Sequence, residues 1–332
     1  MKVLVYGAGV IGSYLAHVLC EGKNDVTVLA RGRWREHLEN SGLRIHHHLQ
    51  KKDTVDRPKV IGSISEAGEY DAVFAVMPYD KMDIILDDLA ALAAPVVILV
   101  GNNMSAGDMQ ARILEKTVCP KTVLFAFQST AGKRDFDTGI LTCERAGSGN
   151  MDIGGLDFMP GKALRDKLES AFMGTGYKLR WQSDMDAFLV CHLAAVMPLG
   201  YITYANGGSM LPSTRKQRKL VVKATREAFD MLQSLGYDIV PEGDDKYYKP
   251  GIKRGVMKFV YFLMSKTVMG DLIACAHCRN AYSEMKLLDR KFSEVIARAK
   301  GFPMPNWDKL KALVPPEDEL DRIYLRQREV RK

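Results

Sequence analysis

The amino-acid sequence predicts an α/β fold in its first half, a doubly wound and mostly parallel sheet, followed by an all-helical second part. Two observations carry this prediction. Short, almost uniformly apolar runs alternate with helical patterns up to about residue 182, as expected of strands covered on both faces. Beyond residue 183 only long helical patterns remain. We therefore expect two domains, residues 1–182 and 183–332, with a cleft between them.

The individual elements follow from these patterns. Strands are expected at residues 2–6, 26–30, 71–76, 95–100, 122–127 and 178–182, and helices at 81–92 and 109–116. Residues 42–60 predict an excursion of two strands, and residues 140–153 predict a hairpin closed by a Gly-Ser-Gly turn. In the second part, helices are expected at residues 184–204, 215–235, 248–268 and 280–300, with the charged tail 322–332 as the solvated face of a terminal helix.

The most informative segment is KVLVYGAGVIG at residues 2–12, in which an apolar strand runs into a glycine turn and then a helix. That context is what a G-x-G-x-x-G pattern needs to indicate a dinucleotide site. Gly7 permits the tight turn, Gly9 lets the backbone approach a pyrophosphate, and Gly12 lets the helix pack on the strand. With Val10 and Ile11 they form a helix N-terminus whose free N–H groups suit phosphates. The segment predicts a Rossmann-type domain.

The end of the second strand indicates which dinucleotide is bound. A site for NAD usually places Asp or Glu there to bind the ribose 2′-hydroxyl. This chain has Arg31, with Arg33 and Arg35 close behind. A guanidinium pairs with a 2′-phosphate, which a carboxylate repels. We therefore expect NADP(H) as the cofactor, the alternative being that the arginines are only a solvated helix start.

Composition narrows the class of protein further. The chain has 332 residues, 47% hydrophobic and 26% charged, which is ordinary for a globular protein. The net charge of +7 is spread out, so we expect no nucleic-acid partner. Six cysteines without a framework spacing predict reduced thiols and a cytoplasmic location. No apolar run approaches 18 residues, so no membrane span or membrane partner is expected.

Three side chains are candidates for reaction chemistry. Asn102 follows the strand ending at Val100, where ligands of open α/β sheets bind, although such an Asn can also simply cap the next helix. His192 lies in an apolar helix and could act as a general acid, although a core histidine is the alternative. Glu284 stands near a helix start, close to His277, where a glutamate can also just complement the dipole.

No metal site is expected. His46, His47 and His48 lie on a predicted strand, where neighbours point to opposite faces. The Cys275-x-His277-Cys278 segment has a CxxC spacing but no second pair of ligands in the sequence.

These residues together resemble a known family. The segments VYGAGVIGSYLA at 5–16, ARG at 30–32, GNN at 101–103, Ser283-Glu284-Met285 and AKGFPMPNWDKLKAL at 299–313 are similar to ketopantoate reductase (2-dehydropantoate 2-reductase). The resemblance implies a Rossmann domain joined to a helical domain like that of 6-phosphogluconate dehydrogenase. It also implies NADPH-dependent reduction of 2-dehydropantoate to (R)-pantoate in pantothenate biosynthesis. The site residues that it implies are Gly7, Gly9 and Gly12 at the pyrophosphate, Arg31 at the 2′-phosphate, Asn102 by the nicotinamide and Glu284 by the substrate.

The sequence departs from the family where catalysis is concerned. The family carries a catalytic lysine in a K-x-x-x-N-x-x-x-N-P-L pattern, and this chain has Leu189, Leu193 and Met197 at the three polar positions. Met77 stands where the family has a second lysine, on the cofactor side. His192 lies one turn after Leu189 on the same helix face and could project an acid into nearly the same space.

Our leading hypothesis is therefore an NADPH-dependent reductase of a 2-oxo acid or related small carbonyl substrate. In it His192 is the general acid, and Glu284 and Asn102 orient the substrate, which we expect to be larger or less polar than ketopantoate. The rival hypothesis is a non-catalytic NADP(H)-binding sensor. The helical domain is where two copies could pair in a homodimer.

Overall fold

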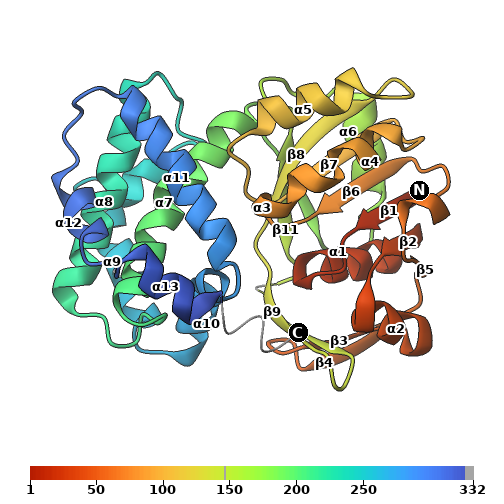
Figure 1. Ribbon diagram of the computed structural model, residues 1–332, viewed down its shortest axis with the longest axis horizontal. Coiled ribbons are helices and arrows are strands. Elements are labelled where there is room, and N and C mark those ends of the chain that lie inside the picture. Colours follow the sequence, from red (N-terminus) through yellow and green to blue (C-terminus); the bar gives the residue numbers. More distant parts are fainter. Residues whose placement is uncertain (146, 326–332) are drawn as a thin grey trace. The chain divides into compact units, whose positions relative to one another are not determined.

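The computed structural model describes residues 1–145 and 147–325 (Figure 1). The chain divides into two compact units, unit 1 from Met1 to Met185 and unit 2 from Asp186 to Lys332. Unit 1 contains the strands, and unit 2 consists of helices and their connections. The predicted fold class, an α/β part followed by an all-helical part, is confirmed.

The main sheet of unit 1 has eight strands in the order β12-β11-β8-β7-β6-β1-β2-β5. All neighbouring pairs are parallel except β11 with β8. Strand β1 lies between β6 and β2, so the chain reverses its direction of winding there, and the carboxyl ends of these strands form the switch point where such sheets bind ligands. The strands are β1 (Lys2–Tyr6), β2 (Asp25–Leu29), β5 (Lys59–Ile61), β6 (Ala72–Val76), β7 (Val96–Val100), β8 (Thr122–Gln128), β11 (Asn150–Gly154) and β12 (Lys178–Trp181).

Burial explains why these segments form strands. Strands β6 and β7, AVFAV and VVILV, are buried at every position, as expected for parallel strands covered on both faces. The helices of unit 1 are α1 (Val10–Glu21), α2 (Gly32–Ser41), α3 (Tyr79–Met82), α4 (Leu86–Ala91), α5 (Ala106–Glu115) and α6 (Lys162–Ser170). The helix expected at 81–92 is interrupted, because a 3₁₀ turn at Asp83–Ile85 separates α3 from α4. Another 3₁₀ turn spans Ile64–Glu66.

A second, smaller sheet has the order β4-β3-β10-β9. It comprises β3 (Leu43–His47), β4 (Lys52–Asp56), β9 (Ala131–Asp135) and β10 (Ile140–Glu144). The two-strand excursion predicted at 42–60 is present as the antiparallel pair β3–β4. The hairpin predicted at 140–153 is wrong: β10 pairs with β3 and β9, whereas β11 pairs with β8 and β12 in the main sheet. Each half finds its partner far away in the sequence, which local turn chemistry cannot show.

Helix α1 lies between the two sheets of unit 1. It contacts β1 and β2 of the main sheet and also β3, β9 and β10 of the small sheet. Its residues from Gly12 to Leu19 are all buried, and they share one hydrophobic core with apolar side chains of both sheets. Because α1 begins at the glycine turn, this double packing fixes the start of the helix beside the ends of the strands.

Unit 2 is built from α7 (Met185–Ala205), α8 (Arg215–Ser234), α9 (Ile252–Met264), α10 (Val268–Asn280), α11 (Tyr282–Arg298), α12 (Pro305–Lys311) and α13 (Glu317–Tyr324). A 3₁₀ turn spans Asp244–Tyr247. The helix expected at 248–268 begins only after Gly251, whose φ of 150° no helix accommodates, and it ends at Met264. Helix α10 was not predicted. The terminal helix expected at 322–332 corresponds in part to α13, and residues 326–332 lie outside the described residues.

One expectation about apolar length needs correction. Helix α7 holds an 18-residue window of mean hydropathy 1.6 and, among the described residues, is long and apolar enough by composition alone to cross a membrane. In the structure 72% of that window is buried. The core helix of a globular unit passes the same test, because it too is surrounded by apolar side chains.

Candidate functional site

Two of the three glycines in the turn after β1 are required by the packing. Gly7 has a φ of 112°, and a Cβ there would lie 2.3 Å from the carbonyl oxygen of Val76. At Gly12, a Cβ would lie 1.9 Å from the carbonyl oxygen of Gly7. Neither position accepts any side chain without movement of the backbone. They bring β1, β6 and α1 together at the switch point of the main sheet.

Gly9 differs, because no atom lies within 4 Å of the place that its Cβ would take. It is the N-cap of α1, with no side-chain cap and no acidic residue in the first turn, which Val10 and Ile11 open. The N–H groups at a helix start lack hydrogen-bond partners within the helix. The positive end of the helix dipole lies there as well, so this position favours an anion. The open space above Gly9 therefore fits the pyrophosphate of a dinucleotide.

Arg31 lies beside this turn, at the N-cap of α2, and is exposed. Its Nη2 donates to the hydroxyl oxygen of Tyr6 at 3.4 Å, and that hydroxyl donates to Asp88 Oδ2 at 2.7 Å. Burial and the carboxylate of Asp88 raise the pKa of Tyr6 to about 12, so the hydroxyl stays protonated. Tyr6, the last residue of β1, thus helps to orient the guanidinium of Arg31.

The two arginines that follow Arg31 form ion pairs with carboxylates. Arg33 pairs with Asp137 at 3.1 Å, and Arg35 pairs with Glu39 at 2.7 Å. Arg31 makes no ion pair with any carboxylate in the part of the chain that the structure describes. Of the three, Arg31 is therefore the guanidinium available to a phosphate.

Met77 and Gly101 close the other side of the turn. A Cβ on Gly7 would lie 3.2 Å from Met77 Sδ, so this thioether packs against the glycine turn. Gly101 has a φ of 140°. A Cβ added at this position would lie only 3.2 Å from the carbonyl oxygen of Met77, so the two backbone segments are close together. The ends of β6 and β7 thus meet the turn with an apolar side chain where the family resemblance implies a lysine.

The two asparagines after β7 have different surroundings. Asn103 Oδ1 accepts the backbone N–H of Ser105 at 2.8 Å, just before α5, so Asn103 organises the helix start. Asn102 is buried at 7% exposure. The helix-start role considered for Asn102 thus falls to its neighbour.

In unit 2 the structure brings His192, His277 and Glu284 together from α7, α10 and α11. His277 Nε2 lies 3.6 Å from Glu284 Oε2, the carboxylate being buried at 5% side-chain exposure and the imidazole exposed at 44%. Burial, and then the nearby charge of His277, lower the pKa of His192 to about 4. The ring of Phe188 lies parallel to that of His192, with centroids 6.3 Å apart. The pKa makes His192 a neutral imidazole at pH 7.

The positions of the missing polar groups are apolar and buried. Leu189, Leu193 and Met197 are exposed by only 2%, 1% and 2%. No side chain at these places can donate or accept a proton. Polar chemistry on this part of α7 is therefore left to His192.

The two cysteines near His277 are core residues. Cys275 Sγ accepts a hydrogen bond from the Thr203 hydroxyl at 3.2 Å. Burial raises the pKa of Cys275 to about 11 and that of Cys278 to about 12. Such thiols stay protonated at neutral pH, whereas a metal ligand must be a thiolate.

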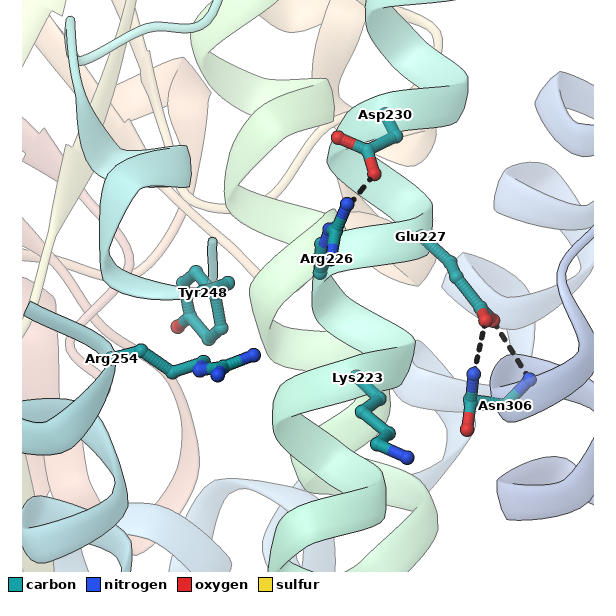
Figure 2. A pocket seen from close by; sticks show the side chains of 7 residues that line it. All are labelled: Lys223, Arg226, Glu227, Asp230, Tyr248, Arg254 and Asn306. Carbon is teal, nitrogen blue, oxygen red and sulfur yellow. Dashed lines mark hydrogen bonds and ion pairs between the residues drawn. The ribbon is translucent and has the colours of Figure 1, made fainter. Parts of the chain in front are cut away.

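A separate cavity of about 280 Å³ lies against α8 in unit 2 (Figure 2). Most of its polar side chains make contacts that stabilise unit 2. Glu227 Oε2 accepts hydrogen bonds from the backbone N–H groups of Asn306 and Trp307 at 2.8 and 2.9 Å, and Arg226 forms an ion pair with Asp230. Glu227 thereby satisfies the start of α12. The cavity contains none of the predicted site residues; its lining is Lys223, Arg226, Glu227, Asp230, Tyr248, Arg254 and Asn306.

The small sheet was not predicted as a neighbour of the glycine turn. Gly132 of β9 packs against the start of α1, because a Cβ there would lie 3.0 Å from Val10 Cγ1. The segment AGKRD of β9 has neither apolar alternation nor β-branched residues, so no local signal marks it as a strand.

Fold and glycine turn together define a Rossmann-type nucleotide-binding domain joined to a helical unit. Residues 3–156 match the family described as Ketopantoate reductase PanE/ApbA, so the N-terminal unit contains a domain of that family. The predicted resemblance to this family is thus confirmed for these residues.

Sequence relatives match only short segments. An uncharacterized oxidoreductase, YkpB, of Bacillus subtilis is 36% identical over 89 residues, which cover 27% of this chain and 28% of that protein. A 2-dehydropantoate 2-reductase of Mesorhizobium japonicum is 30% identical over 93 residues, 28% of each. Both matches span less than a third of the relatives' own length.

Solved structures extend the likeness in fold to nearly the whole chain. The 2-dehydropantoate 2-reductase of Methylococcus capsulatus has a TM-score of 0.69 at 16% identity, covering 94% of this chain and 95% of that one. A ketopantoate reductase of Ralstonia eutropha has a TM-score of 0.70 at 16% identity, covering 94% and 97%. A D-mandelate dehydrogenase with NADH and anilino(oxo)acetate has a TM-score of 0.68 at 15% identity, again covering 94% and 97%.

Proposed function

We propose that this protein is an NADPH-dependent reductase of a 2-oxo acid or a related carbonyl compound. One observation carries the proposal: the glycine turn is closed at Gly7 and Gly12 but open above Gly9, and Arg31 stands beside it without a carboxylate partner in the described part of the chain. That arrangement suits a pyrophosphate at the start of α1 and a second phosphate at the start of α2.

The choice of NADPH over NADH depends on Arg31. Since a guanidinium binds a phosphate more strongly than a neutral hydroxyl, the extra phosphate of NADPH gains most from it. One structural neighbour, D-mandelate dehydrogenase, is described in complex with NADH, so the fold alone does not select NADPH. The preference must therefore be measured on this chain.

When bound, the cofactor supplies a hydride to the carbonyl carbon of the substrate. His192, neutral at pH 7 because burial lowers its pKa to about 4, would donate a hydrogen bond to the carbonyl oxygen. The proton of the product hydroxyl would come from His277, whose ring is exposed to water and lies 3.6 Å from the Glu284 carboxylate. Glu284 would orient His277, and Asn102 would orient the nicotinamide or the substrate.

The substrate is expected to carry an apolar group beside its 2-oxo acid function. Leu189, Leu193 and Met197 offer no polar partner on α7, which disfavours the hydroxyl group of ketopantoate. The anilino(oxo)acetate of the D-mandelate dehydrogenase complex is an amide analogue of a 2-oxo acid with an aromatic substituent.

The test is consumption of NADPH with a panel of 2-oxo acids that includes 2-dehydropantoate and aromatic members, repeated with NADH. We expect turnover with NADPH, and Arg31→Ala should weaken NADPH binding while Arg35→Ala, its matched control, leaves it unchanged, because Arg35 pairs with Glu39. Tighter binding of NADH than of NADPH by the unaltered protein would contradict the assignment of Arg31.

A second candidate function is an NADP(H)-binding sensor without catalysis. It is favoured by the three buried apolar side chains Leu189, Leu193 and Met197, because a sensor needs no acid there. It predicts NADPH binding with no turnover on any carbonyl compound. The same panel of substrates therefore separates the two functions.

A further inference from the structure

The small sheet places an arginine directly on the glycine turn. Arg134 of β9 donates from Nη1 to the carbonyl oxygen of Ala8 at 3.0 Å, in the middle of the turn. Ser13 Oγ also donates to this oxygen, at 3.3 Å. A side chain more than 120 positions away in the sequence thus lies beside the proposed cofactor site.

The same guanidinium also reaches the start of α2. Its central carbon lies 5.3 Å from the ring centroid of Trp34 and 5.0 Å from that of Phe136. Trp34 stands one turn after Arg31, on the helix that Arg31 caps. Arg134 therefore lies between the glycine turn and the place where the 2′-phosphate is expected, held by two aromatic rings.

This position is fixed from α2. Arg33 Nη2 and His37 Nε2 both donate to the carbonyl oxygen of Phe136 at 2.8 Å, so the turn after β9 is tied to the helix. A guanidinium held in place by neighbouring groups loses little freedom when it binds a ligand.

The positive charge of Arg134 has no carboxylate partner among the described residues. Arg134 is partly buried, burial lowers its pKa, and no carboxylate among residues 1–145 and 147–325 forms an ion pair with it. Buried charges in proteins are normally paired, because an uncompensated one is costly. The surroundings are thus complete only when an anion is present.

We propose that Arg134 is a second cationic ligand of the adenosine 2′-phosphate, acting opposite Arg31 and making this chain selective for NADPH. The inference rests on the proposed function. The pyrophosphate is the less favoured target, because the N–H groups at the start of α1 serve it and because both rings that hold Arg134 belong to α2 and the turn tied to it.

The experiment measures the dissociation constants of NADPH and NADH by calorimetry for the unaltered protein, Arg134→Met, Arg134→Lys and the control Arg35→Met, whose guanidinium pairs with Glu39. Charge-assisted hydrogen bonds predict a loss of NADPH affinity of about 10- to 100-fold in Arg134→Met, with little change for NADH. Arg134→Lys should recover part of the loss, since it keeps the charge but not the fork of donors. The control should bind both cofactors as before.

Thermal unfolding without cofactor separates ligand binding from a structural role. Removing a partly buried cation that has no counter-charge should leave the melting temperature of Arg134→Met unchanged or raised. A lowered melting temperature with unchanged NADPH affinity would overturn the inference, and so would equal weakening of NADPH and NADH. If the unaltered protein binds neither cofactor, the proposed function itself fails, whereas tight NADPH binding by Arg134→Met refutes the role of Arg134 alone.

Discussion

Gly9→Ala should abolish tight cofactor binding while leaving the fold intact. The backbone at Gly9 has φ −69° and ψ −170°, which alanine adopts freely, and its new methyl group would meet no protein atom within 4 Å. Alanine is a poorer N-cap than glycine, which lowers the free energy of unfolding by roughly 1 kcal/mol. Alanine also restricts the unfolded chain, which raises the free energy of unfolding by about 0.4–1 kcal/mol. The net change in stability is therefore within about 1 kcal/mol, a shift in Tm below about 4 °C for a unit of this size.

The effect on binding should be much larger. The methyl group would occupy the space proposed for the pyrophosphate and separate it from the N–H groups at the start of α1. Losing one or two charge-assisted hydrogen bonds weakens binding by about 10- to 100-fold or more. Gly161→Ala is a matched control, because Gly161 is the N-cap of α6, has extended backbone angles (φ −56°, ψ 151°) and is equally open. Calorimetry with NADPH and a thermal melt measure both quantities; equal NADPH affinity in Gly9→Ala and Gly161→Ala would refute the assignment of the glycine turn.

Three further predictions concern catalysis and stability. His192→Ala should lower kcat by about 10²- to 10³-fold, because it removes the hydrogen-bond donor to the carbonyl oxygen, and unchanged turnover across the substrate panel would remove His192 from the mechanism. Burial lowers the pKa of His47, and likewise that of His192, to about 4. Since the unfolded chain titrates near pH 6.5 and takes up more protons below it, Tm should fall as the pH drops from about 6.5 to 4; His47→Gln should flatten this dependence, and an identical pH profile would contradict it. Glu227→Ala removes the acceptor at the start of α12 and should destabilise unit 2 by roughly 1–2 kcal/mol in denaturant titrations, whereas an unchanged midpoint would show that water replaces the cap.

Structure that depends on neighbours along the chain could be predicted from the sequence. β1, the glycine turn and α1 are adjacent in sequence, so the pattern at residues 2–12 contains all the information needed to predict them. Strand pairing between segments distant in the sequence could not be predicted. β10 and β11 are neighbours in the chain, yet they join different sheets, and β9 acquires its strand conformation only by pairing with β10.

The candidate site divides in the same way. Arg31 could be predicted because the end of the second strand is a position with a known role in dinucleotide binding. Arg134 could not, because its place on the glycine turn depends on how the small sheet packs on α1. The proximity of His192 to His277 likewise depends on the packing of α7 with α10, a helix that showed no pattern in the sequence.

Transfer of the hydride from NADPH to a substrate can be followed with an isotope label. NADPH carrying deuterium at the transferred position of C4 is incubated with the protein and a panel of 2-oxo acids, and the products are read by mass spectrometry. We expect deuterium at C2 of a 2-hydroxy acid, with the label lost in Gly9→Ala and kept in Gly161→Ala. NADPH that binds tightly but leaves no deuterium in any 2-hydroxy acid would contradict the reductase and favour the sensor.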